Sequence, residues 1–191
     1  MIKKVLIANR GEIAVRVIRT CREMGIRSVA IYSDADRISP HVLLADEAYC
    51  IGPPPSSKSY LKIETILDTV NKCGVDGVHP GYGFLSENAV FANEIKSRGI
   101  VWIGPPENSI KIMGDKVAAR KMAEKLNIPL IPGSGDLIDD PQNAITHADE
   151  IGYPLLVKAV GGGGGKGMRI VHSKKELTSA IERGMSEAQN A

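Results

Sequence analysis

The stretch "KAVGGGGGKGMRI", from Lys158 to Ile170, has the residue types of a phosphate-binding loop. Five consecutive glycines lie between two apolar runs that read as strands. Backbone N–H groups of glycines can approach phosphate oxygens closely because no Cβ is in the way. Lys158 and Lys166 add positive charge. A flexible linker is the alternative, but linkers have polar flanks, and ordering five glycines costs much backbone entropy. We therefore expect a hairpin loop that folds over a nucleotide.

Two better-known phosphate motifs fit this stretch poorly. A P-loop ending at Gly165-Lys166 would need glycine where Val160 stands, and serine or threonine where Gly167 stands. A G-x-G-x-x-G pattern is present formally, but it should open a helix, and "MRIVHS" follows it as a strand. The first strand-to-helix turn, "NRGEIA", has one glycine where a dinucleotide fingerprint has three. Nicotinamide or flavin binding is therefore not expected.

Lys158 raises a separate question because it stands in an apolar run, "YPLLVKAV". Burying an ammonium group without a partner is costly, and a bound phosphate would supply the partner. The alternative is a side chain that extends to the surface and needs no ligand.

The residues before the glycine stretch alternate between strand and helix patterns. Apolar runs predict strands at 4–9, 28–32, 47–52, 76–80 and 101–105, and helical periodicity predicts helices at 11–25, 60–74 and 87–99. Strands separated by helices indicate a parallel sheet covered on both faces.

The pattern changes near Gly104. Helices are predicted at 104–114 and 115–127, the second capped by Asp115, and a third begins at Asp140-Pro141 and ends at Gly152. The apolar face of this third helix should comprise Ala144, Ile145, Ala148 and Ile151. Strands at 153–160 and 168–173 flank the glycines, and a Ser173–Glu176 capping box should open a last helix. We expect two domains, residues 1–113 and 114–191.

Composition excludes several classes of protein. The net charge of +2 and the 4% aromatic content do not favour nucleic-acid binding. Three widely spaced cysteines argue against a disulfide framework or a zinc site and favour a reducing compartment. No apolar run reaches the roughly 20 residues of a membrane helix, and the start is not that of a signal peptide. A cytoplasmic protein is expected.

Taken together, several motifs resemble biotin carboxylases, the ATP-grasp subunits or domains of acetyl-CoA, pyruvate and related acyl-CoA carboxylases. These motifs are "KVLIANRGEIAVRVIR", "HPGYGFLSEN", "MGDK", "IGYPLLVKA" and "GGGGGKGMRIV", in that order. The resemblance implies an α/β fold, in which a Rossmann-like parallel-sheet N-domain is followed by part of an ATP-grasp α+β lid subdomain. It also implies that MgATP and bicarbonate form carboxyphosphate, which carboxylates biotin on a carrier domain.

The resemblance also implies roles for single residues. ATP contacts fall on Lys116, Lys158, Gly163, Gly164, Gly165, Lys166, Gly167 and Met168. Tyr82 and Gly83 fall near the biotin pocket, although "HPGYGF" could be a plain turn with local aromatic packing. Arg19 and Glu23 match dimer contacts, although they could form an ordinary surface i,i+4 pair. Lys166 stands where arginine is common, which keeps the charge but loses a bidentate contact.

Other parts of the site are expected beyond Ala191: the carboxylates that bind Mg²⁺, the bicarbonate-binding arginines and the base. The resemblance therefore implies an N-terminal fragment without catalytic residues of its own, inactive alone, with a loop that is mobile without nucleotide. Expected partners are a biotin carboxyl carrier domain, a carboxyltransferase subunit and a second copy bound through the N-domain. The alternatives are another ATP-grasp ligase, of the carbamoyl-phosphate or purine-pathway type, or a non-catalytic nucleotide-binding and dimerisation module.

Overall fold

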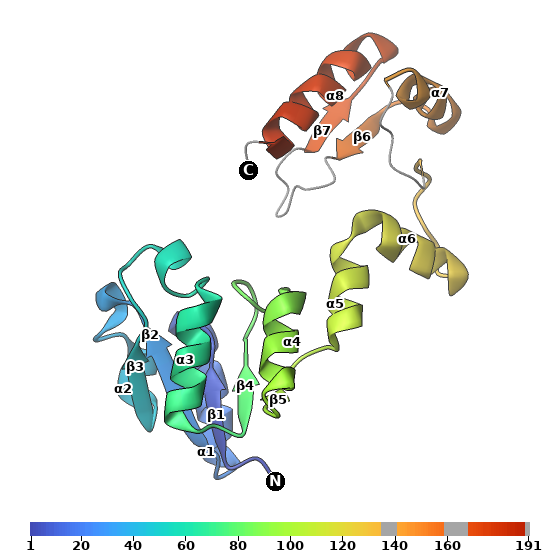
Figure 1. The fold of residues 1–191 in the computed structure, drawn as a ribbon. Helices are drawn as coiled ribbons and strands as arrows, with labels where there is room; N and C mark the ends of the chain where they lie inside the picture. The colour runs from blue at the N-terminus through green and yellow to red at the C-terminus, as the bar shows by residue number, and fades with distance from the viewer. Residues whose placement is uncertain (135–140, 159–167, 190–191) are drawn as a thin grey trace. The chain divides into compact units, whose positions relative to one another are not determined.

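The structure, a computed structural model, describes residues 1–134, 141–158 and 168–189. It divides into two compact units, Met1–Lys111 and Ile112–Ala191, and the division falls inside one helix. Each unit is drawn in Figure 1. Among the helices of the described ranges, none combines the length and apolarity needed to cross a membrane.

The first unit is built on a five-stranded sheet with the order β3-β2-β1-β4-β5. Its strands are β1 (Lys4–Ile7), β2 (Arg27–Tyr32), β3 (Glu47–Cys50), β4 (Gly77–His79) and β5 (Val101–Trp102), and every pairing is parallel. The parallel sheet predicted from the sequence is thereby confirmed. The order changes direction between β1 and β4, and such a switch point is where open parallel sheets bind ligands.

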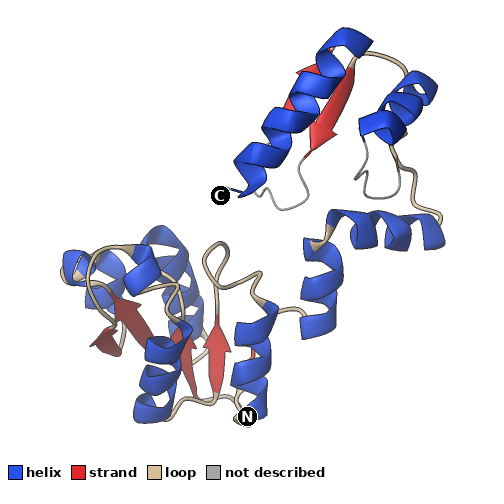
Figure 2. Cartoon of the chain, turned by 45° about the horizontal axis from the view of Figure 1, so that its top comes forward, coloured by secondary structure: helices blue, strands red, loops and turns tan. Residues whose placement is uncertain are grey.

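Helices cover both faces of this sheet (Figures 1 and 2). The helices are α1 (Gly11–Glu23), α2 (Pro40–Leu44), α3 (Ile63–Cys73) and α4 (Ala89–Ser97). Side chains alternate along β1, so Val5 and Ile7 pack with α1, whereas Leu6 and Ala8 pack with α3 and α4. Two apolar layers therefore hold the carboxyl ends of the strands in place.

Helix ends follow local chemistry. Gly25 and Gly74 adopt positive φ values of 69° and 59° directly after α1 and α3, as C-terminal glycines do. Helix α3 begins at Ile63, three residues later than predicted, because the 3₁₀ turn Ser56–Lys58 continues as a turn over residues 59–61. That turn, the 3₁₀ turn Asp34–Asp36 and the five-residue α2 were not predicted.

The second unit contains a hairpin packed against two helices. Its elements are α5 (Glu107–Gly114, shared with the first unit), α6 (Lys116–Lys125), α7 (Pro141–Ile151), β6 (Leu155–Lys158), β7 (Met168–Val171) and α8 (Lys174–Gln189). Strands β6 and β7 are antiparallel, and α8 lies along them (Figure 2). Their core comprises Ala148, Val171, Leu177 and Ala180.

Three local expectations for this unit were tested. The Asp115 cap is confirmed, since its carboxylate accepts a hydrogen bond from Ala118 N–H at 2.7 Å. Ile151 was wrongly placed on the buried face of α7: it is 40% exposed at the helix end. The reciprocal capping box is also wrong, because the Glu176 carboxylate accepts from His172 N–H (3.0 Å) and from the Ser173 hydroxyl (3.3 Å).

Candidate functional site

Among the described residues of the second unit, none covers one face of the β6–β7 hairpin. Lys158, the last residue of β6, pairs with Met168, the first of β7, and Leu156 pairs with Ile170. Alternate residues of a strand share a face, so these four side chains form one surface, here called the open face. Leu156, Met168 and Ile170 are 44%, 47% and 66% exposed. Leu155 and Val157 point the other way and pack against the helices.

The open face brings together chemistry that suits a nucleotide. Three aliphatic side chains offer a surface for a flat base, and the Lys158 ammonium offers charge for phosphate. Lys158 is not buried, however: its side chain is exposed, as the surface alternative expects, and has no desolvation cost to recover. What singles out Lys158 is its position beside the glycine-rich segment.

The other predicted phosphate contacts fall in two places. Lys116 is the first residue of α6, exposed, directly after the Asp115 cap. Gly163, Gly164, Gly165, Lys166 and Gly167, and with them the expected mobility of the loop, lie outside the described residues.

Tyr82 and Gly83 lie in the loop that follows β4, at the switch point of the first sheet. The residues from Pro80 to Phe84 are here called the Tyr82 loop. Gly81, Gly83 and Phe84 all have positive φ values, 67°, 70° and 44°, so the chain bends sharply. Tyr82 is 56% exposed and its hydroxyl donates to the Glu12 carboxylate at 2.8 Å. That hydrogen bond raises the pKa of Tyr82.

Only one of the two aromatic side chains in the Tyr82 loop is a packing residue. Phe84 packs against the main core and stacks on Tyr60, with ring centroids 5.2 Å apart. Tyr82, whose ring is exposed, is available to a ligand. At the loop entrance, His79 Nδ1 accepts from Gly81 N–H at 2.9 Å, and burial lowers the pKa of His79.

The residues that hold the Tyr82 loop in place were not predicted from the sequence. Asn9 and Arg10 come after β1 and Ala8 and contact this loop, while Asp36 and Tyr60 contact Arg10. The signal was present, since "NRGEIA" was recognised as the turn where dinucleotide folds bind phosphate. Its single glycine led only to the exclusion of a cofactor.

The predicted dimer residues lie on the outer side of α1. Arg19 and Glu23 are both exposed. Among the described ion pairs, none joins Arg19 to Glu23, so the surface-pair alternative finds no support.

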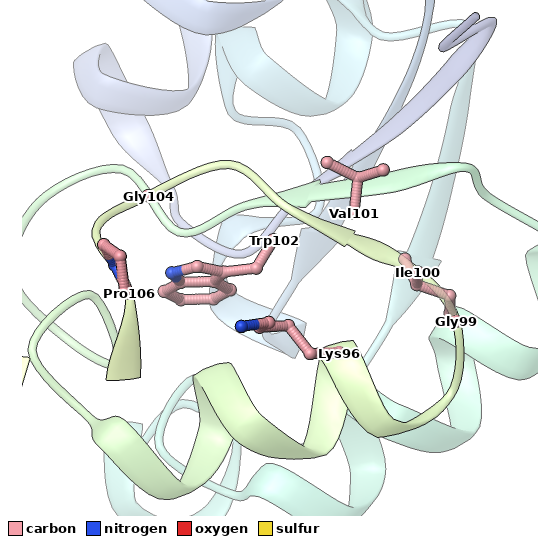
Figure 3. A pocket seen from close by; sticks show the side chains of 7 residues that line it. All are labelled: Lys96, Gly99, Ile100, Val101, Trp102, Gly104 and Pro106. Carbon is pink, nitrogen blue, oxygen red and sulfur yellow. The ribbon is translucent and has the colours of Figure 1, made fainter. Parts of the chain in front are cut away.

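A shallow cavity of about 410 Å³ opens at the edge strand β5 (Figure 3). Its lining residues are Lys96, Gly99, Ile100, Val101, Trp102, Gly104 and Pro106, and none is a predicted site residue. A second hollow, of about 460 Å³, lies between β7 and α8 and borders Met168. Within the described ranges, no group of three or more His, Cys, Asp or Glu side chains is arranged to hold a metal ion.

Comparison with known proteins finds one family match in each unit. Residues 1–110 match the family described as "Biotin carboxylase, N-terminal domain". Residues 115–191 match "Carbamoyl-phosphate synthase L chain, ATP binding domain".

Whole-chain relatives agree with these matches. The biotin carboxylase of Haemophilus influenzae is 51% identical over all of this chain and 43% of its own length. The propionyl-CoA carboxylase alpha chain of Ruegeria pomeroyi is 48% identical over all of this chain and 28% of its own length. The chain thus spans less than half the length of these relatives.

Solved structures show the same likeness. The biotin carboxylase of Campylobacter jejuni superposes with a TM-score of 0.96 at 42% identity, covering all of this chain and 43% of that one. The biotin carboxylase domain of Hydrogenobacter thermophilus 2-oxoglutarate carboxylase superposes with a TM-score of 0.95 at 46% identity, covering all of this chain and 42% of that one. The match of the first 110 residues, over more than half of the chain, together with these relatives, shows that this chain belongs to the biotin carboxylase family.

Proposed function

We propose that this chain is the N-terminal, nucleotide-binding part of a biotin carboxylase. The enzyme would use ATP and bicarbonate, through carboxyphosphate, to carboxylate biotin held on a carrier domain. The Hydrogenobacter relative is described as a complex with MgADP, ADP and bicarbonate, and the Campylobacter relative as a complex with a β,γ-ATP compound. Their likeness over all of this chain supports the proposal.

The open face of the hairpin is the single observation that carries the ATP part. Its aliphatic side chains, Leu156, Met168 and Ile170, would pack on the base, and the Lys158 ammonium would face the phosphates. Lys116 and the glycine-rich segment, with Gly163, Gly164, Gly165, Lys166 and Gly167, would complete the phosphate contacts as ATP-grasp enzymes do. The described residues offer no acidic cluster for Mg²⁺, so we assign no metal-dependent step to them.

Tyr82 and Gly83 would contribute the biotin contact. The exposed Tyr82 ring offers an apolar surface, and its hydroxyl has an anchor in Glu12. Gly83 has nothing within 4 Å of where a Cβ would be, so a ligand can approach its backbone.

The remaining partners are also proposals. The Hydrogenobacter relative is described as a domain dimer, and the exposed Arg19 and Glu23 on α1 support a homodimer through the first unit. Carrier and carboxyltransferase partners follow from the likeness to subunits of larger carboxylases, such as the Ruegeria propionyl-CoA carboxylase alpha chain. A cytoplasmic location agrees with the three free cysteines.

The test is ATP hydrolysis by a full-length biotin carboxylase that carries these 191 residues. We expect bicarbonate-dependent hydrolysis that free biotin stimulates, and none from the 191-residue chain alone, because phosphoryl transfer needs charge neutralisation that two lysines and the glycine-rich loop do not supply. Bicarbonate-dependent hydrolysis without any response to biotin would instead favour another ATP-grasp ligase, of the carbamoyl-phosphate or purine-pathway type. ATP-linked assembly without turnover would favour a non-catalytic module.

A further inference from the structure

We propose that Asn9 and Arg10 are positioning residues for biotin: they hold the Tyr82 loop in the conformation that presents Tyr82 and Gly83. This inference rests on the proposed function, which places biotin at that loop. It concerns the turn between β1 and α1, the place where a dinucleotide fold of this topology binds its cofactor phosphates.

Asn9 bridges two backbone groups of the loop. It is fully buried, and its Nδ2 donates to Pro80 C=O at 2.8 Å and to Tyr82 C=O at 3.0 Å. Its Oδ1 accepts from Arg10 N–H at 2.9 Å. Both ends of the amide are thus satisfied in this orientation only, because a flipped amide would set oxygen against two carbonyls. One side chain fixes the backbone on both sides of Gly81.

The chain approaches Asn9 so closely that a side chain at position 81 would force its neighbours to shift. A Cβ built on Gly81 would lie 2.7 Å from Asn9 Nδ2 and 2.7 Å from Ile13 Cγ2. Gly81 also has a φ of 67°. The loop is therefore seated on Asn9 and the first turn of α1.

Arg10 contacts the last residue of the loop, Phe84, at its aromatic ring. Its guanidinium lies 5.2 Å from the centroid of Tyr60 and 5.5 Å from that of Phe84, and these two rings stack on each other. Asp36 pairs with the same guanidinium, with Arg10 Nη1 and Asp36 Oδ2 3.4 Å apart. Arg10 and Tyr60 thus hold Phe84 in place, at the opposite end of the loop from Pro80.

Asp36 stands where a dinucleotide fold has its ribose-binding residue, but here its carboxylate is hydrogen-bonded within the protein. An acidic residue after the second strand binds ribose in dinucleotide folds. Asp36 instead accepts from the Tyr60 hydroxyl at 2.7 Å and the Ser33 hydroxyl at 2.8 Å. Partial burial raises the pKa of Asp36, but these hydrogen bonds and that from Arg10 outweigh it and keep the pKa below its ordinary value. The Asp36 carboxylate therefore holds Arg10 and Tyr60, both of which contact Phe84.

Amide hydrogen exchange measures the hold on the loop directly. In the 191-residue chain, Asn9→Asp should speed exchange of the Gly81 and Ser86 amides by about tenfold, since it replaces two donated hydrogen bonds by facing oxygens. Both amides are hydrogen-bonded, to His79 Nδ1 and Gly83 C=O. Asn88→Asp is the matched control, because Asn88 only accepts, from Phe91 N–H, as aspartate also can. Arg10→Met is a second variant with little risk to the fold, since the Arg10 side chain is 45% exposed.

Kinetics in a full-length carboxylase separate positioning from plain stabilisation. Asn9→Asp and Arg10→Met should raise the KM for free biotin by about tenfold, while the KM for ATP changes less than about twofold. Equal changes in both constants, or exchange rates that match those of Asn88→Asp, would overturn the inference. If the unmutated enzyme shows no response to biotin, the proposed function fails instead, and the exchange rates still decide whether Asn9 and Arg10 hold the loop.

Discussion

At the scale of single residues, the exposure of Lys158 makes it a clean probe of nucleotide binding. Its side chain packs in no core, so Lys158→Met should leave the free energy of unfolding within about 0.5 kcal/mol of its original value. Loss of a charge-assisted contact to phosphate should raise the KM for ATP by about tenfold or more. Steady-state ATP hydrolysis in a full-length carboxylase with these residues measures it.

Lys125→Met is the control for this prediction. Lys125 is likewise exposed in the second unit, at the end of α6, but lies in none of the predicted contacts. An unchanged KM for ATP in Lys158→Met, or an equal rise in both variants, would show that the open face does not bind phosphate.

At the scale of elements, the two glycines of the Tyr82 loop should respond differently to alanine. Both have positive φ, which costs an alanine about 1–2 kcal/mol. Gly83→Ala should lower the free energy of unfolding by this backbone cost only, because nothing lies within 4 Å of its Cβ position. Gly81→Ala should cost about 1–3 kcal/mol more, since its Cβ meets Asn9 and Ile13.

Urea unfolding followed by the fluorescence of Trp102 measures both substitutions. Trp102, the sole tryptophan of the chain, is in β5 of the same unit and is 8% exposed. Equal costs for the two variants would show that the loop is free to move away from Asn9.

Elements with a long periodic pattern could be predicted from the sequence, and short ones could not. The helix at α1 and the strand at β2 follow from apolar spacing alone. Helix α2 has five residues, too few for a period to show, and its His41 is buried by tertiary contacts. The pairing of Glu176 with Ser173 could be predicted, but its donors could not: the Glu176 carboxylate accepts from the Ser173 hydroxyl and from His172 N–H, because the residue preceding a cap is free to offer its own N–H.

The candidate site could be predicted only as far as local motifs reach. Lys158 and Met168 were recognised from their segment, but their pairing across the hairpin is a matter of register. Asn9 and Tyr82 are 73 positions apart, and only the parallel pairing of β1 with β4 brings them together. Contacts of this kind depend on which strands are neighbours in the sheet. The spacing of residues within one motif does not predict that order.

At the scale of the whole molecule, the buried His41 and the partly buried His79 should make the first unit less stable in mild acid. Burial lowers the pKa of His79; burial also lowers that of His41, outweighing the hydrogen bond to Ile31 C=O. The folded pKa values thus lie below the unfolded value of about 6.5, so the unfolded chain binds more protons. The stabilisation is complete above about pH 6.5 and is lost as the pH falls through the folded pKa values.

The carboxylates whose pKa the fold lowers, such as those of Asp46 and Asp76, do not contribute to this change. Backbone and hydroxyl hydrogen bonds from Ser28 lower the pKa of Asp46, and those from Lys3 and Lys4 N–H lower the pKa of Asp76. Their ordinary value is 3.8, so they stay charged in both states above about pH 5. A loss of stability between pH 7.5 and 5.5 therefore reports on histidine.

We expect the free energy of unfolding to fall between pH 7.5 and 5.5, by at most about 1.4 kcal/mol per histidine for each pH unit below 6.5. His79→Asn should reduce this fall, because its Oδ1 keeps an acceptor for Gly81 N–H but does not titrate. Urea unfolding at the two pH values, followed by Trp102 fluorescence, measures it. A fall of the same size in His79→Asn would show that His79 is not responsible. No fall in the unmutated chain would show that neither histidine is held neutral by the fold.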